Sequence, residues 1–298
     1  MVMRRWSMVV AATALLLGPA CTTGAGETLS AIAPQAQIGR FVFTGWDGPA
    51  LPVFYALPDK VEADTPVVIV MHGVNRDADR YRDEWAGLAR QYGFIAVCPQ
   101  FASADFPGAL GYNTGYFTSA DGTPRPRSQW SFAAIEPLFD DVRARFGTDA
   151  ARYTIYGHSA GSQFVHRYVL FTPEARIERA IAANAGWYTM PDRAVTFPYG
   201  LGDTPVGPDG LAAALGKPLT VLLGTADTDR ADTDLRKTPE ADAQGFHRFE
   251  RGQTFYARGQ GAAKASGVPF GWTMQFVPGI AHSNAGMAKA AAALIAGR

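Results

Sequence analysis

Cysteine is scarce in this sequence, with only Cys21 and Cys98 among 298 residues. A scaffold held together by several disulfides is therefore excluded, and the fold must depend on its hydrophobic core. Cys98 ends the apolar run at residues 94–97, which predicts a buried thiol that packs as a small hydrophobic group. No histidine neighbours Cys98 in the sequence, so we do not expect it to be a nucleophile.

The sequence also lacks an excess of charge of either sign. Its 27 lysines and arginines balance its 27 aspartates and glutamates, so the formal net charge at pH 7 is zero. No basic run stands out, which argues against a nucleic acid as a partner. With 47% hydrophobic and 18% charged residues, the composition is that of an ordinary globular protein, long enough for one large domain. Small neutral or apolar substrates fit this composition best.

No apolar run reaches the roughly 20 residues that a membrane-spanning helix needs. The apolar stretch at residues 8–17 follows Arg4 and Arg5 and precedes the small residues GPA at 18–20. A basic start, a short apolar stretch and a small-residue cleavage site are typical of a signal peptide. We expect residues 1–20 to be removed on export, residues 21–36 to form a flexible linker, and the mature protein to be periplasmic or secreted.

Cys21 directly follows this expected cleavage site and precedes the polar stretch TTGAG. The arrangement resembles the lipid-modified cysteine of a bacterial lipoprotein, which would attach the protein to a bacterial membrane. Gly18 departs from the leucine that usually lies three residues before such a cysteine, and Pro19 is also atypical. The residues fit both lipid anchoring through Cys21 and plain secretion.

Beyond residue 36, strand-like and helix-like segments alternate. Residues 39–44 and 50–57 predict an antiparallel pair at one edge of a sheet, and the β-branched run 67–71 is typical of a strand buried on both faces. Further strands are expected at residues 94–97, 153–156, 179–183, 219–223 and 272–277, and helices at residues 81–92, 134–146, 162–171, 241–265 and 285–296. The alternation predicts a mostly parallel, doubly wound α/β domain over residues 37–298.

Two long segments interrupt the alternation, residues 99–130 and 187–218. Both lack periodicity and follow the carboxyl ends of predicted strands, where open α/β sheets bind ligands. Trp187 directly follows such a strand end and is our candidate for a substrate contact. An aromatic wall is also expected from Tyr112, Tyr116, Phe117, Trp130, Trp187 and Tyr188. The second segment lacks the periodicity of an amphipathic lid helix, which predicts an open cleft for short acyl or aryl esters.

The most informative motif is GHSAG at residues 157–161, between a predicted strand and a predicted helix. A serine hydroxyl is a poor nucleophile, so it needs a strained strand-to-helix turn where a base reaches Oγ and a backbone N–H faces the developing oxyanion. Gly157 and Gly161 permit that turn because they carry no Cβ. The motif predicts Ser159 as the nucleophile and the backbone N–H of Ala160 as an oxyanion donor.

An acid and then a base follow Ser159, in the chain order of the α/β hydrolases. Asp227 and His282 each lie just past a predicted strand. His282 would take the proton of the serine and pass it to the leaving group, while Asp227 would fix the tautomer of the histidine and stabilise its charged form. Asp229 is the alternative acid. His247 is the alternative base, although it falls inside a predicted helix.

The four aspartates Asp227, Asp229, Asp232 and Asp234 also suggest a calcium site. Their spacing lacks the loop glycine and the terminal glutamate of an EF-hand. We therefore expect no metal at this segment.

Upstream, the stretch VMHGVN at residues 70–75 leaves the buried strand. A loop at this point can aim a backbone N–H at the tetrahedral oxyanion from the side opposite Ala160. Val74 is the predicted donor and Asn75 is the alternative, which also makes Asn75 a candidate substrate-binding residue. His72 is expected to shape the loop by hydrogen bonding and not to titrate during the reaction.

From His72 onward the chain resembles an α/β-hydrolase esterase, specifically the bacterial group related to polyhydroxybutyrate depolymerases and feruloyl esterases. Three stretches carry the resemblance: HGVNR at 72–76, YTIYGHSAG at 153–161 and NAGWY at 184–188. The resemblance implies a serine carboxylic-ester hydrolase that needs no metal or cofactor and acts on a small-molecule or oligomeric ester. Val74 stands where the depolymerases often carry a cysteine.

Several related functions stay open beside ester hydrolysis. A peptidase, an acyltransferase and a polyhydroxyalkanoate depolymerase all use the same fold and the same catalytic groups. A dienelactone hydrolase would need cysteine at position 159 and a haloalkane dehalogenase would need aspartate there, so Ser159 excludes both in their usual forms. A binding protein on an inactive hydrolase scaffold is disfavoured by the complete set of serine, aspartate and histidine.

Overall fold

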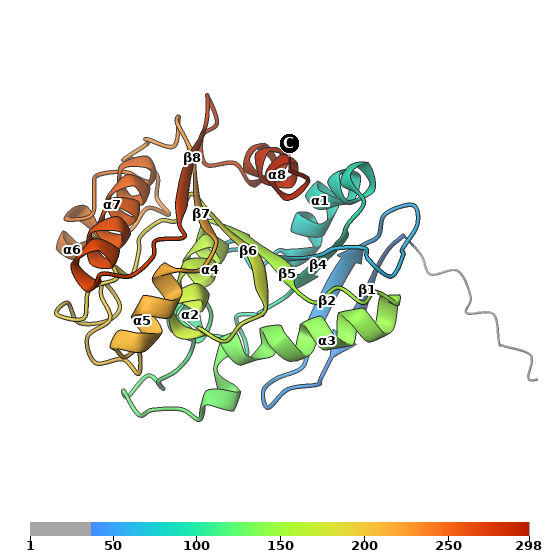
Figure 1. The fold of residues 1–298 in the computed structure, drawn as a ribbon, viewed down its shortest axis with the longest axis horizontal. Coiled ribbons are helices and arrows are strands. Elements are labelled where there is room, and N and C mark those ends of the chain that lie inside the picture. The colour runs from blue at the N-terminus through green and yellow to red at the C-terminus, as the bar shows by residue number, and fades with distance from the viewer. Residues whose placement is uncertain (1–36, 298) are drawn as a thin grey trace, which may run out of the picture. The chain divides into compact units, whose positions relative to one another are not determined.

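An eight-stranded sheet organises residues 37–297, the part of the chain that the computed structural model describes (Figure 1). The strands are β1 (Ile38–Phe43), β2 (Leu51–Ala56), β3 (Val67–Met71), β4 (Ile95–Pro99), β5 (Tyr153–His158), β6 (Ile177–Ala183), β7 (Leu219–Gly224) and β8 (Thr273–Val277). Their order is β1-β2-β4-β3-β5-β6-β7-β8. β1 and β2 form the predicted antiparallel edge, β2 pairs antiparallel with β4, and the strands from β4 to β8 are parallel. The predicted mostly parallel sheet is confirmed.

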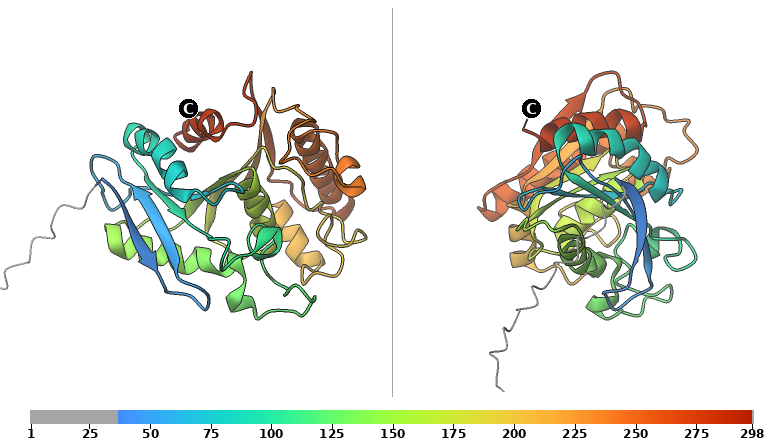
Figure 2. Two further views of the ribbon diagram at one scale, coloured as in Figure 1. Left: turned by 180° about the vertical axis from the view of Figure 1, so that it is seen from behind. Right: turned by 90° about the vertical axis from the view of Figure 1, so that its right-hand side faces the viewer.

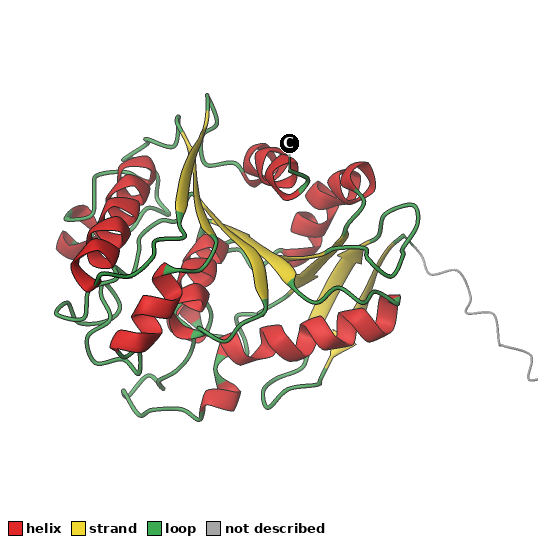
Figure 3. Cartoon of the chain, in the orientation of Figure 1, coloured by secondary structure: helices red, strands yellow, loops and turns green. Residues whose placement is uncertain are grey.

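Helices cover both faces of this sheet (Figures 1 and 2). The helices are α1 (Ala78–Tyr92), α2 (Gly108–Gly111), α3 (Ile135–Phe146), α4 (Ala160–Phe171), α5 (Pro208–Leu215), α6 (Pro239–Asp242), α7 (Arg248–Ser266) and α8 (Asn284–Ile295), with short 3-10 helices η1 (Arg127–Gln129) and η2 (Ser131–Ala134). α1 and α8 pack together on one face, whereas α3, α4, α5 and α7 lie on the other. The secondary-structure colouring of Figure 3 makes the α/β layering visible.

The burial of β3 explains why its sequence is a continuous apolar run. All five of its residues are buried, because helices cover both faces of the sheet at this strand. Successive side chains of a strand point to opposite faces. Accordingly Val68 and Val70 join the core beneath α1 and α8, while Ile69 and Met71 join the larger core on the opposite face.

The predicted helical stretch at residues 241–265 is confirmed for its larger part by α7, but its first residues belong to a separate short helix, α6. Thr238 caps α6 by accepting from the N–H of Ala241, and His247 caps α7 by accepting from the N–H of Glu250. Between them Gly245 has φ +143°, a conformation that side-chain-bearing residues rarely adopt. The caps and this glycine end one helix and start the next.

The expectation that residues 187–218 are entirely irregular is also wrong, because they contain α5. Pro208 starts this helix at a position where its missing N–H costs nothing. Leu211, Ala214 and Leu215 form its buried side, and the helix packs against α4 and α7. Helix α5 therefore contributes to the core.

The predicted signal peptide at residues 1–20, the linker at residues 21–36 and Cys21 all lie outside the described residues. The roles proposed for these residues are therefore still predictions.

Within residues 37–297, no helix has the length and apolar character needed to cross a bilayer. Cys98 is buried in β4 as predicted, and burial raises the pKa of its thiol.

Candidate active site

Ser159 occupies the sharp turn between β5 and α4. Its backbone has φ 58° and ψ −118°, a conformation that is uncommon for any residue other than glycine. Two hydrogen bonds hold the turn: the Ser159 N–H donates to the carbonyl of Ala183 at 3.1 Å, and the Gln163 N–H donates to the carbonyl of Ser159 at 3.1 Å. The surrounding backbone thus fixes a strained residue at the end of a central strand.

The two glycines of the motif are required by close backbone contacts. A Cβ on Gly161 would lie 2.1 Å from the carbonyl oxygen of Met71, and a Cβ on Gly157 would lie 2.2 Å from the carbonyl oxygen of Gly161. Real Cβ atoms essentially never approach so closely. The predicted reason for both glycines is therefore confirmed: only glycine lets β5, the turn and α4 pack against β3.

Ser159, His282 and Asp227 form a continuous chain of hydrogen bonds. His282 Nε2 lies 3.0 Å from Ser159 Oγ, and His282 Nδ1 lies 2.7 Å from Asp227 Oδ2. Asp227 is only 2% exposed. Because the carboxylate has no proton to give, Nδ1 is the protonated nitrogen, which leaves Nε2 free to accept the proton of the serine hydroxyl.

The alternative acid and base take part in other interactions. Asp229 is exposed, and its carboxylate accepts from the backbone N–H of Ala231 at 2.7 Å. His247 caps α7 through Nδ1, which accepts from the N–H of Glu250 at 3.2 Å. The structure therefore brings Asp227 and His282, and neither alternative, to Ser159.

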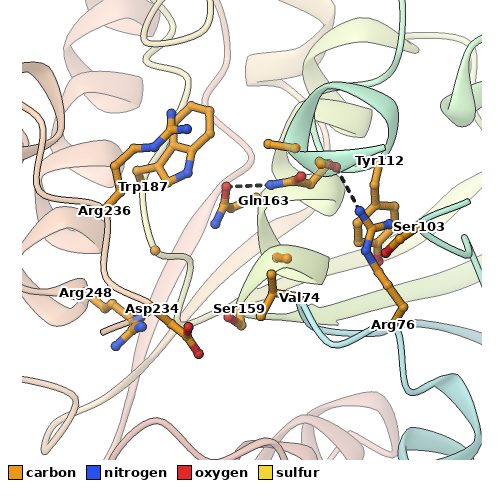
Figure 4. A pocket seen from close by; sticks show the side chains of 15 residues that line it. Val74, Arg76, Ser103, Tyr112, Ser159, Gln163, Trp187, Asp234, Arg236 and Arg248 are labelled. Atoms are coloured by element: carbon orange, nitrogen blue, oxygen red, sulfur yellow. Dashed lines mark hydrogen bonds between the residues drawn. The ribbon is translucent and has the colours of Figure 1, made fainter. Parts of the chain in front are cut away.

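Two residues beside Ser159 have backbone N–H groups without a hydrogen-bond acceptor in the described part of the chain. Within residues 37–297 the N–H groups of Val74 and Ala160 make no hydrogen bond. For Ala160 the reason is general, because the first N–H groups of a helix have no intrahelical acceptor. Both residues line the pocket beside Ser159, where Figure 4 labels Val74, whereas the exposed Asn75 lines the neighbouring pocket next to His282.

His72 holds the loop that carries Val74. The N–H of Phe101 donates to His72 Nε2 at 3.0 Å, so the proton resides on Nδ1, which donates to the carbonyl of Gly73 at 3.0 Å. The hydroxyl of Tyr112 donates to the carbonyl of His72 at 2.9 Å. Burial lowers the pKa of His72 to about 4, so the ring is neutral near pH 7. The prediction that His72 shapes this loop is confirmed.

A pocket of about 290 Å³ opens beside Ser159 (Figure 4). Both irregular segments contribute to it, the first through Tyr112 and the second through Trp187. The indole of Trp187 lies between two guanidinium groups, with Arg167 at 4.0 Å and Arg236 at 4.3 Å from the ring centroid. The structure thus places Trp187, the candidate for a substrate contact, in the lining of the pocket.

Most of the predicted aromatic wall packs elsewhere. Phe117 and Trp130 pack with Phe171, the last residue of α4, whereas the pocket is lined by the first turn of that helix, and the fully buried Tyr188 stacks on Phe255. These rings stabilise the two irregular segments by burying apolar area. The expectation of an aromatic wall is therefore wrong for most of its members.

Sequence reasoning missed two arginines of the site. Arg236 and Arg248 line the pocket together with Ser159. Arg248 is 1% exposed and donates to Asp232 Oδ2 at 2.6 Å and to Asp227 Oδ1 at 3.4 Å. No local signal marks such a residue, because an arginine at the start of a helix is ordinarily exposed. Only the tertiary structure reveals that this one is buried beside Asp227.

Two solved structures are closely similar to this chain, although no family model matches it. Poly(aspartic acid) hydrolase-1 from Sphingomonas sp. KT-1 is 51% identical with a TM-score of 0.86, over 88% of this chain and 99% of that one. LpqC, a poly(3-hydroxybutyrate) depolymerase from Bordetella parapertussis, is 36% identical with a TM-score of 0.82, over 88% and 90% of the two chains. The chain belongs to the hydrolase family related to poly(3-hydroxybutyrate) depolymerases. The predicted α/β-hydrolase fold and the resemblance to this bacterial group are confirmed.

A curated relative adds a shorter match. Poly(3-hydroxyalkanoate) depolymerase C from Paucimonas lemoignei is 27% identical over 134 residues, which are 45% of this chain and 30% of that protein. The match thus spans less than a third of the length of the depolymerase. Solved structures of serine hydrolases and esterases that are less than 20% identical to this chain share only its α/β-hydrolase fold.

Proposed function

We propose that the protein hydrolyses carboxylic esters with short acyl or aryl groups through a covalent acyl-enzyme on Ser159. The observation that carries this proposal is the hydrogen-bonded chain from Ser159 Oγ through His282 to Asp227. It supplies a nucleophile, a base and an acid within hydrogen-bonding distance of one another, as acyl transfer requires. Membership of a family of hydrolases supports the same class of reaction.

Each step of the reaction has a group at hand. Ser159 Oγ attacks the carbonyl carbon while His282 Nε2 takes its proton, and the N–H groups of Val74 and Ala160 stabilise the oxyanion. When the tetrahedral intermediate collapses, the leaving alcohol receives that proton and the acyl group stays on Ser159. A water molecule then gives a proton to His282 and attacks the acyl-enzyme, which releases the acid and restores the serine hydroxyl.

We expect short acyl chains to react fastest, because the two pockets that Ser159 lines have only about 290 and 300 Å³ and the one regular helix of residues 187–218 packs into the core. The values of kcat/KM for p-nitrophenyl acetate and butyrate should exceed the value for p-nitrophenyl palmitate by about tenfold or more. No rise in activity should accompany a lipid interface. A preference for acyl chains longer than about ten carbons, or interfacial activation, would contradict this reading of the pocket.

A second candidate is hydrolysis of the amide bonds of an acidic polymer, which the same catalytic groups can perform. The relative with 51% identity is a poly(aspartic acid) hydrolase, and the partly exposed Arg236 lines the pocket beside Ser159. Guanidinium groups bind carboxylates well. Amine release from poly(aspartic acid) tests this function, and sodium chloride should weaken it without affecting acetate esters, because salt screens exposed charges. Release of 3-hydroxybutyrate from its polymer tests the depolymerase alternative in parallel.

We also propose that the protein is exported, with cleavage before Cys21 and either lipid attachment at that residue or release into the periplasm or medium. The basic start, the short apolar stretch and the small-residue cleavage site support export. The intact mass of the mature protein is expected to lack Arg4 and Arg5. A diacylglycerol increment on Cys21 would identify the anchored form. A mature protein that retains both arginines would overturn the proposal.

A further inference from the structure

Arg248 lies where a positive charge is electrostatically unfavourable. It is the first residue of α7 and is 1% exposed. The N-terminus of a helix is itself positive, so a cation there is destabilising. Burial adds the cost of removing a guanidinium from water. Nearby negative charge must offset both costs, and two carboxylates supply it.

The guanidinium lies between those two carboxylates. Nη1 donates to Asp232 Oδ2 at 2.6 Å and to Asp227 Oδ1 at 3.4 Å, while the other oxygen of Asp227 binds His282. The N–H of Phe249, the next residue of α7, donates to the carbonyl of Asp227 at 3.2 Å. Arg248 and the start of α7 therefore hold one oxygen and the backbone of Asp227, and leave the second oxygen for the histidine.

The charges of this cluster do not cancel. Asp227 and Asp232 contribute two negative charges and Arg248 one positive charge, so one negative charge remains to face a protonated His282. Removing the charge of Arg248 would raise the net negative charge of the cluster to two, whereas removing the charge of Asp232 would reduce it to zero. The charge that stabilises the imidazolium thus depends on both partners of the arginine.

The other titratable groups around His282 are the same in the wild type and in variants of Arg248 and Asp232, so they add a constant charge to this balance. The ring of His158 lies 4.5 Å from that of His282, and burial holds its pKa well below the ordinary value, so it is neutral near pH 7. Its Nδ1 contacts the hydroxyl of Tyr81. On the side of Asn75, the charged groups near His282 are Asp77, Arg80, Glu84 and Asp234. Arg80 pairs with both Asp77 and Glu84, and Asp234 is exposed.

We propose that Arg248 and Asp232 are positioning residues of the catalytic machinery: together they hold Asp227 toward His282 and set the net charge that the histidine faces. This inference rests on the proposed role of Ser159, Asp227 and His282. It predicts that neutralising Arg248 and neutralising Asp232 move the pH midpoint of the activity that depends on His282 in opposite directions. A merely structural pair would not produce shifts of opposite sign.

The test is the pH dependence of kcat/KM for p-nitrophenyl acetate in Arg248→Met and Asp232→Asn. Only the neutral imidazole accepts the serine proton, so activity rises with pH as His282 loses its proton. In Arg248→Met the extra negative charge stabilises the imidazolium, and the midpoint of the acid limb should move up by about one pH unit. In Asp232→Asn the midpoint should move down by about the same amount. Both variants should also lose about tenfold in kcat, because Asp227 is held less well.

Matched controls come from the same segment. Asp229→Asn and Arg230→Met make the same two kinds of charge change, but Asp229 is exposed and Arg230 is 47% exposed. Water and salt screen such charges, so neither control should move the midpoint. Arg248→Lys retains the positive charge without the planar fork of arginine. Its midpoint should therefore stay near that of the wild type while kcat falls.

The rate of labelling by a fluorophosphonate, measured over the same pH range, reports on Ser159 without a turnover assay. Midpoints that stay unmoved, or that move in the same direction in Arg248→Met and Asp232→Asn, would overturn the inference. Should Arg248→Met fail to fold by circular dichroism, Asp232→Asn and Arg248→Lys decide the matter by themselves. Failure of the wild type to be labelled would instead count against the proposed function, so the two failures can be distinguished.

Discussion

Replacing Ser159 with alanine is expected to reduce the kcat of p-nitrophenyl acetate hydrolysis by about 10⁴-fold or more, with the fold unchanged. The change removes Oγ and its 3.0 Å contact with His282 Nε2. The backbone hydrogen bonds that hold the turn do not involve the side chain, so alanine should adopt the same conformation. Residual activity would come from the oxyanion donors and from binding alone. Initial rates, together with loss of fluorophosphonate labelling, measure the effect.

The next serine of α4 supplies a matched control. Ser162 is fully buried, and among the described residues its Oγ has no hydrogen-bond partner. Ser162→Ala therefore removes an unsatisfied hydroxyl of the same size, at little or no cost in stability. It should retain wild-type kinetics and labelling. Activity of Ser159→Ala within tenfold of the wild type would show that another group is the nucleophile.

The features that were predicted correctly from the sequence are those with strong local signals. The continuous apolar run at β3 indicates a strand buried on both faces, and this burial follows from the helices that cover both sides of the sheet. The motif around Ser159 is equally local, because the backbone can make its turn only where Gly157 and Gly161 stand. Such signals need no knowledge of the rest of the chain.

The features that were missed depend on residues distant in the sequence. His247 reads as part of a helical stretch, yet it caps α7 because the chain turns at Gly245. Arg248 reads as a surface residue, and its burial depends on Asp227 and Asp232, which the sheet brings to it. Sequence periodicity reports which face of an element is apolar. It does not report which carboxylates a buried guanidinium will meet.

Asp227→Asn and His282→Ala should each reduce kcat by about 10⁴-fold. Asparagine at position 227 presents an NH₂ group that donates to Nδ1, so the ring proton moves to Nε2 and opposes the serine hydroxyl. Alanine at position 282 removes the proton acceptor altogether. Because the three groups act through one network, the double variant should be scarcely worse than either single variant. Steady-state kinetics on folded protein measure all three.

Asp229→Asn and His247→Ala separate these roles from their nearest alternatives in the sequence. Asp229 is exposed and contacts only its own loop, so its neutral variant should stay within tenfold of the wild type. His247→Ala removes the cap of α7, at a cost of about 1 kcal/mol in the free energy of unfolding, while leaving Ser159, His282 and Asp227 in contact. It should therefore lower the melting temperature and keep most of its kcat. A severe loss of kcat in Asp229→Asn, with little effect of Asp227→Asn, would transfer the role of the acid to Asp229. It would also require the loop after β7 to rearrange, because Asp227 Oδ2 lies 2.7 Å from His282 Nδ1 in this structure.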